Sequence, residues 1–233
     1  MTRWQRRIER AAELAQEHPA TVAMLGFYRE LALFQSDPRI GPNVPEHLPE
    51  LLDLVRLKGT VVLAERAVYL TSHSEEWAGM LSCRDDPVYA FFIRAIEQPY
   101  FERRALQSGV NTKTVQPTCP FCFEPPVVAV LRPEGDGGRR TLQCGLCFTE
   151  WEFRRLLCPG CGEEDREKLP VYTSREFPHI RVEACDTCRH YVKAVDMTRD
   201  GKAVPEVDEM AALPLDFWAV EHDYERLAPN LFW

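Results

Sequence analysis

The chain has 233 residues, of which 45% are hydrophobic and 27% are charged, and its net charge is −8. This balance excludes an intrinsically disordered chain, and the length suffices for one ordinary domain or two small ones. No run of about eighteen apolar residues is present, which excludes a membrane-spanning helix, and the N-terminal stretch lacks the continuous apolar core of a secretory signal. We therefore expect a cytoplasmic protein that makes no membrane contact.

The N-terminal half has the spacing of amphipathic helices. Apolar residues recur at helical intervals over residues 4–15, 21–35 and 51–70. Four prolines within residues 38–49 predict a loop between the second and third of these stretches. Asp86 followed by Pro87 is a helix-start signal, and Pro99 predicts a kink or break in the helix that follows. Residues 1–116 are therefore predicted to form a helical bundle domain.

The pattern changes near residue 117 from helical periodicity to short apolar runs. These runs predict strands over residues 127–131, 139–143, 151–153, 169–173, 180–184 and 191–195. The segment 200–233 then returns to two short helical patterns, which Pro214 separates, and it supplies six of the eight net negative charges. We expect this acidic helical tail to pack on the body of the protein.

None of three successive segments of the chain carries an excess of basic over acidic side chains. Residues 1–118 carry 14 basic and 15 acidic side chains, residues 119–199 carry 12 and 13, and residues 200–233 carry 2 and 8. Phosphate binding relies on a basic excess. No nucleic-acid partner is therefore expected.

Eight of the nine cysteines form four C-x-x-C pairs, and their spacing indicates an internal repeat. The pairs are Cys119 with Cys122, Cys144 with Cys147, Cys158 with Cys161, and Cys185 with Cys188. The first and third pairs start 39 residues apart and the second and fourth start 41 apart. One unit is thus predicted over residues 117–156 and a second over residues 157–199.

This spacing predicts two metal sites, each made of four cysteines. A C-x-x-C turn presents both sulfurs to one ion at about 2.3 Å, and a hairpin between two such turns brings four sulfurs together. The repeat favours the sequential arrangement, in which the first two pairs hold one ion and the last two hold the other, although spacing alone also permits an interleaved one. Disulfides do not persist in a reducing compartment, and a thioredoxin-like redox motif needs a single C-x-x-C beside a βαβ pattern, which is absent here. Four thiolates accept iron or zinc, and geometry does not choose between them.

No catalytic residues are predicted. Cys83 stands alone beside Asp85 and Asp86, and acidic neighbours disfavour a reactive thiolate, so it is interpreted as structural. The six histidines lack metal-ligand spacing, and His190, two residues after Cys188, is interpreted as a strand residue. The chain also lacks a nucleophile elbow, a glycine-rich phosphate loop and paired carboxylates. We therefore expect a protein that is not an enzyme.

Three motifs of the cysteine-rich half resemble those of the formate dehydrogenase accessory protein family, FdhE. They are C-x-x-C-x-x-x-P-V, C-x-x-C-x-T-E-W-x-x-x-R and E-x-C-x-x-C-x-x-Y-x-K, and the ending VDEMAALPLDFWAVEHDYERLAPNLF fits the same family. The resemblance implies a helical N-terminal region followed by two rubredoxin-like units, with the eight paired cysteines as ligands and iron as the favoured metal. It also implies a cytoplasmic protein that binds the catalytic subunit of a molybdenum- or tungsten-dependent formate dehydrogenase and is needed for its activity.

The chain departs from the family pattern at Phe123 and Phe148, which stand where a glycine often follows the second cysteine.

Two other functions share the cysteine spacing. A rubredoxin-like electron carrier needs no large helical half, and the acidic balance disfavours a nucleic-acid-binding zinc ribbon. The predicted fold class is α+β, with a helical N-terminal domain, two tandem rubredoxin-like or zinc-ribbon units and a short helical tail.

Overall fold

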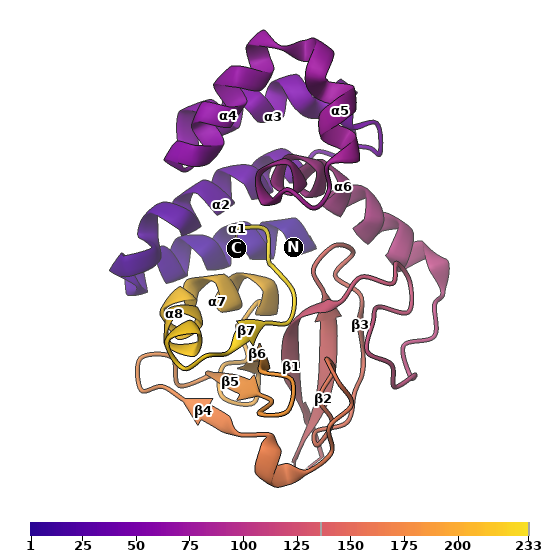
Figure 1. Ribbon diagram of the computed structural model, residues 1–233, viewed down its shortest axis with the longest axis vertical. Coiled ribbons are helices and arrows are strands. Elements are labelled where there is room, and N and C mark those ends of the chain that lie inside the picture. The colour runs from indigo at the N-terminus through magenta and orange to yellow at the C-terminus, as the bar shows by residue number, and fades with distance from the viewer. Residues whose placement is uncertain (136, 233) are drawn as a thin grey trace. The chain divides into compact units, whose positions relative to one another are not determined.

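A computed structural model describes residues 1–135 and 137–232 (Figure 1). The chain divides into two compact units. One consists of residues 1–104 together with Leu231 and Phe232, and the other of Ala105–Asn230. The first is helical and the second carries the sheet, so each is described in turn.

The helical unit contains six α-helices among its described residues. They are α1 (Arg3–Glu17), α2 (Val22–Gln35), α3 (Val44–Lys58), α4 (Val61–Ser72), α5 (Trp77–Ser82) and α6 (Pro87–Ser108), the last of which runs on into the second unit. The apolar faces of α2 to α6 form one core, in which Leu48, Leu51 and Phe92 are fully buried. Leu231 belongs to this core, and the Phe232 ring packs 5.5 Å from that of Phe27. Two residues that follow the sheet-bearing unit in the sequence therefore complete the helical core.

The structure shortens the predicted proline-rich loop and excludes a break at Pro99. The loop predicted over residues 38–49 is shorter than expected, because α3 begins at Val44 and Pro45 occupies its first turn, where no backbone N–H is needed. The helix α6 continues past Pro99 to Ser108. Pro99 cannot donate to the Ala95 carbonyl, and the side-chain Nε2 of Gln35 donates to that oxygen instead, at 2.8 Å. A side chain from another helix thus supplies the hydrogen bond that proline removes.

The helix-start signal at Asp86 and Pro87 acts as predicted. The Asp86 carboxylate accepts hydrogen bonds from the backbone N–H groups of Val88 and Tyr89, at 2.9 and 3.0 Å, and so caps α6. The helical stretch predicted over residues 51–70 is in fact divided at Gly59 between α3 and α4, and a Cβ at Gly59 would lie 2.6 Å from the Val55 carbonyl oxygen, so only glycine fits there.

The second unit contains a seven-stranded sheet. Its strands are β1 (Pro126–Glu134), β2 (Gly137–Cys144), β3 (Glu150–Glu152), β4 (Val171–Thr173), β5 (Ile180–Ala184), β6 (His190–Asp196) and β7 (Glu225–Arg226). The order is β3-β2-β1-β6-β5-β4, and β7 also pairs with β6. Each cysteine repeat contributes three antiparallel strands, and the parallel pair β1–β6 joins the two sets in one sheet.

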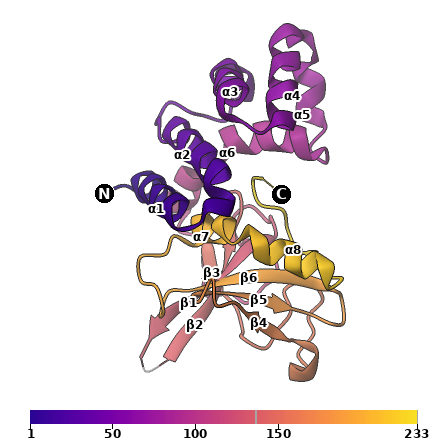
Figure 2. The same ribbon diagram turned by 90° about the vertical axis from the view of Figure 1, so that its left-hand side faces the viewer.

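Two short helices, α7 (Pro205–Ala211) and α8 (Leu213–Glu221), cover one face of this sheet (Figure 2). Val128 and Val195 from the joined strands pack with Ala203 and Ala212 beneath them. The fold class predicted from the sequence is confirmed, since a helical N-terminal region is followed by a sheet that carries two tetracysteine groups. No helix in the described residues is both long enough and apolar enough to cross a bilayer.

A buried ionic network attaches the C-terminal helices to the sheet. Lys193 of β6 lies 3.1 Å from Glu209 of α7 and 2.5 Å from Asp216 of α8, and Arg226 of β7 contacts the same two carboxylates at 2.6 and 2.9 Å. The Tyr191 hydroxyl donates to Asp216 at 2.7 Å. All five side chains are buried, and two cations balance two anions. Burying such charges is tolerable only because each has partners of opposite sign.

Candidate metal centres

The four C-x-x-C pairs form turns of one shape. In each turn the residue after the second cysteine has a left-handed backbone; these residues are Phe123, Phe148, Gly162 and Arg189, with φ of 65°, 55°, 79° and 60°. In the first turn the Phe123 N–H donates to the Cys119 carbonyl at 3.0 Å, and the Cys119 N–H donates to the Glu124 carbonyl at 2.8 Å. The turn also aims the Phe121 N–H at the Cys119 sulfur, 3.4 Å away. Such N–H donors stabilise a thiolate that binds a metal.

The left-handed turn explains why glycine is favoured after the second cysteine and what its absence costs. A non-glycine residue in this region carries strain of about 1–3 kcal/mol. Phe148 is buried, so its ring offsets the strain by packing, whereas the Phe123 side chain is 73% exposed. The strain at Phe123 is therefore uncompensated within the described residues.

We expect Phe123→Gly to stabilise the metal-loaded protein by about 0.5–1 kcal/mol, after the greater chain entropy of an unfolded glycine is subtracted. Urea unfolding followed by circular dichroism measures the change. Phe123→Ala is the matched control, because it removes the ring and keeps the strained backbone, and it should leave stability within about 0.5 kcal/mol of wild type. Equal stabilities for the glycine and alanine variants would contradict this account.

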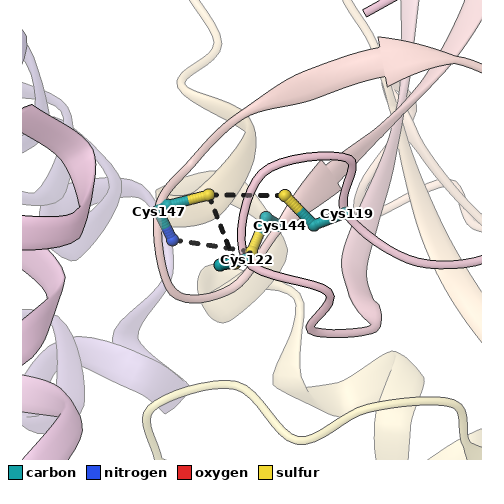
Figure 3. A group of neighbouring side chains, drawn as sticks. All are labelled: Cys119, Cys122, Cys144 and Cys147. Atoms are coloured by element: carbon teal, nitrogen blue, oxygen red, sulfur yellow. Dashed lines mark hydrogen bonds between the residues drawn. The ribbon is translucent and has the colours of Figure 1, made fainter. Parts of the chain in front are cut away.

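The first centre consists of Cys119, Cys122, Cys144 and Cys147, whose sulfurs all lie within 4.8 Å of one another (Figure 3). Three of the sulfur–sulfur distances are 3.5 Å for Cys119–Cys147, 3.4 Å for Cys122–Cys144 and 3.5 Å for Cys122–Cys147. A tetrahedron with metal–sulfur distances of about 2.3 Å has edges of about 3.8 Å. All four cysteines are free thiols, and their separations fit an ion at the middle of the group.

Burial and mutual hydrogen bonding shift the pKa values of the cysteine thiols in the first centre. Cys119, Cys144 and Cys147 are all buried, and only Cys122 is partly accessible. Hydrogen bonds from the neighbouring thiols lower the pKa of Cys119, and hydrogen bonding to Cys119 raises the pKa of Cys144. Without a cation, the pKa of Cys119 is therefore lowered while that of Cys144 is raised. A bound divalent or trivalent ion would stabilise all four thiolates together, since metal ligation requires every thiol to be deprotonated.

The second centre consists of Cys158, Cys161, Cys185 and Cys188 and is more open. The sulfurs of Cys158 and Cys188 are 3.7 Å apart, as are those of Cys161 and Cys185, which again matches the edge of a tetrahedron. Burial raises the pKa of the Cys158 thiol, but Cys161 is exposed to solvent. The donor set fits the same ions as the first centre, with one face accessible.

The structure places the predicted residues as the sequential arrangement requires. The eight paired cysteines fall into two groups of four, and the interleaved grouping does not occur. Cys83 ends α5, is exposed and belongs to neither group. His190 begins β6, and its Nδ1 is buried without a hydrogen-bond partner in the part of the chain that the structure describes.

A third group of metal-type side chains was not apparent from the sequence. His179, Asp200 and Asp208 offer ligand atoms within 4.8 Å of one another. The buried Asp208 carboxylate accepts the Val204 N–H at 2.7 Å and lies 2.9 Å from His179 Nε2. These contacts cap the start of α7 and give the group a structural role.

The chain therefore belongs to the class of proteins that carry two tetracysteine groups. Both groups lie in rubredoxin-like units of one sheet, and a helical unit precedes them in the sequence. Models of the FdhE central domain and the FdhE C-terminal domain match residues 118–155 and 158–233. The chain belongs to the FdhE family.

Relatives and a solved structure agree with this assignment. The FdhE homolog of Aquifex aeolicus is 29% identical over 188 residues, which cover 77% of this chain and 66% of that protein. A homolog from Haemophilus influenzae is 26% identical over 98% of this chain and 87% of its own length. The crystal structure of the FdhE protein from Pseudomonas aeruginosa has the same fold, with a TM-score of 0.74, 24% identity, and coverage of 100% of this chain and 96% of that one.

Proposed function

We propose that this protein is a non-catalytic accessory factor that acts in the cytoplasm on a molybdenum- or tungsten-dependent formate dehydrogenase. In this role it binds the catalytic subunit and is needed for that enzyme's activity. The observation that carries the proposal is the pair of tetracysteine groups within the FdhE central and C-terminal domain matches.

The metal module of the proposal consists of two ions, each of iron or zinc. Cys119, Cys122, Cys144 and Cys147 would hold one ion, and Cys158, Cys161, Cys185 and Cys188 the other. Either ion cross-links its two turns, and iron in addition supplies a one-electron redox step. Four thiolates fill the coordination sphere and leave no open position for a substrate, which supports a binding role over metal-ion catalysis.

The test is an anaerobic affinity purification from the native host, grown with formate metabolism induced, followed by mass spectrometry. We expect the wild-type protein to retain the formate dehydrogenase catalytic subunit. The double variant Cys158→Ser/Cys161→Ser should lose it, and a deletion strain carrying that variant should have less than a tenth of the formate-dependent dye reduction of the wild type.

Cys83→Ser is the matched control, because Cys83 is an exposed cysteine outside both groups. It should retain the catalytic subunit and restore dye reduction. Retention of reductases alone would instead indicate an electron carrier, and either that result or retention by the double variant at the wild-type level would overturn the proposal.

A further inference from the structure

A cavity of about 360 Å³ lies beside the second tetracysteine centre, entirely within the sheet-bearing unit. Cys158, Gly160 and Cys185 form the wall toward the centre. The apolar part of the lining includes Leu156, Leu169, Pro170, Val171 and Leu227. This is the size and composition of a pocket that holds a ligand or a few residues of a peptide.

The cavity is basic in an otherwise acidic chain. Four arginines and one glutamate line it, so these side chains sum to +3 in a protein of net charge −8, beside a tetracysteine centre that would carry −2 with a divalent ion. Glu183 is already paired with Arg140 at 2.8 Å and with Arg181 at 2.6 Å. The other two arginines therefore face the cavity without that carboxylate.

Arg155 and Arg166 are those two arginines, and both are exposed. The Arg155 guanidinium donates to the neutral Gly138 carbonyl, and no carboxylate of the described residues pairs with it. No carboxylate pairs with Arg166 among the residues that the structure describes. Two guanidinium groups that line one cavity, neither paired with a described carboxylate, favour an anionic partner, and carboxylates match the geometry of a guanidinium group.

Two apolar side chains of the lining are exposed to solvent. Leu156 is 50% exposed and Val171 is 51% exposed, and both line the cavity. Val171 lies on β4, which is one of the two edge strands of the sheet. Edge strands present backbone N–H and C=O groups to which an extended segment can add. This combination suits a peptide in extended conformation better than a compact small molecule.

We propose that this cavity is the docking site for an extended acidic segment of the partner protein, with carboxylates on Arg155 and Arg166 and an apolar side chain over Leu156 and Val171. The inference rests on the proposed function, in which the partner is a formate dehydrogenase catalytic subunit. A segment bound there lies beside the second centre on the side of its two buried ligands, Cys158 and Cys185, whereas the exposed Cys161 is not part of the cavity wall.

The first experiment measures binding of the purified catalytic subunit to immobilised, metal-loaded full-length protein. Arg155→Glu/Arg166→Glu should weaken binding at least tenfold. The matched control is Arg175→Glu/Lys202→Glu, which makes the same change in charge at two exposed positions of the same unit that do not line the cavity. The control should bind within twofold of wild type, and circular dichroism with metal analysis checks that both variants are folded and loaded.

The second experiment locates the segment. Synthetic twelve-residue peptides tiled along the catalytic subunit compete for binding, and we expect a competing peptide with at least two carboxylates beside a large apolar residue. Leu156→Ser should weaken that peptide severalfold, and added salt should weaken it further.

Equal affinity of wild type and Arg155→Glu/Arg166→Glu for the subunit would overturn this inference and leave the proposed function standing. Failure of wild type to bind the subunit would overturn both. Absence of any competing peptide, or tighter binding of a mixed-sequence oligonucleotide than of every peptide, would also overturn the acidic-segment assignment.

Discussion

Cys144→Ser is expected to unfold the sheet-bearing unit, whereas Cys161→Ser is expected to leave its sheet folded. Cys144 is the last residue of β2 and is fully buried, and its sulfur also receives the Leu146 N–H at 3.3 Å. Binding of a structural ion to four thiolates contributes about 10–16 kcal/mol in small zinc domains, so loss of one buried ligand removes several kcal/mol of a stability that totals about 5–15 kcal/mol. Cys161 is exposed, and solvent can replace its sulfur.

Guanidinium unfolding and elemental analysis of metal content measure these effects. Wild type and Cys83→Ser should bind two ions per chain, Cys161→Ser between one and two, and Cys144→Ser fewer than one per folded chain. A chelator should also remove the ion of the second centre first, because that centre has an open face. Simultaneous loss of both ions from wild type, or a stable Cys144→Ser variant, would contradict the assigned difference between the centres.

Asp216→Ala is expected to destabilise the protein by about 3–5 kcal/mol, the usual cost of leaving a buried charge without its partner. Asp216 is fully buried and contacts Lys193, Arg226 and the Tyr191 hydroxyl. Removing it leaves two cations facing Glu209 alone. Urea unfolding monitored by tryptophan fluorescence measures the loss.

Two variants test whether charge imbalance causes this effect. Glu221→Ala removes an exposed carboxylate from the same helix and should change stability by less than about 0.5 kcal/mol. Lys193→Met/Asp216→Leu removes one cation with one anion, and should be more stable than Asp216→Ala alone. A double variant as unstable as the single one would show that packing, and not charge, is lost.

The same network gives the stability a pH dependence on the acid side. Burial by itself would raise the pKa of Glu209, but attraction from Arg226 and Lys193 holds that pKa below the ordinary value of 4.5. The ion pairs therefore contribute fully above pH 4.5, and the contribution is lost as the pH falls through the lower pKa of the folded state. The stability difference between wild type and Glu209→Gln should accordingly be constant from pH 7 to 5 and shrink below 4.5.

Local signals predicted much of the fold. The strand over residues 180–184 was predicted at its observed bounds, and the Asp86–Pro87 signal marked the start of α6 because a cap depends only on neighbouring residues. The sequence left a kink and a break at Pro99 both open, and the structure excludes the break; the donor that compensates for proline, Gln35, is distant in the sequence and could not be predicted.

The metal-type groups were predictable for a related reason. The C-x-x-C turns are local, and the repeat indicated which turns combine, so the two groups of four cysteines followed from spacing. The ionic network was not predictable, although its members lie within the family-type motifs Y-x-K and the C-terminal ending. Pairing of Lys193 with Asp216 depends on how α8 packs on the sheet, which no local pattern specifies. The basic cavity was hidden in the same way, since its arginines are scattered along an acidic chain.

The place of Leu231 and Phe232 in the helical core has a consequence for biosynthesis. The helices that form most of this core emerge from the ribosome first, but the two residues that complete it are made only after the whole sheet-bearing unit. At about 10 residues per second, the helical unit waits roughly ten seconds or more with part of its core open. The helical core is therefore completed only after the unit that carries the cysteines has been synthesised. A nascent chain stalled before Leu231 would expose part of this apolar core to chaperones and proteases.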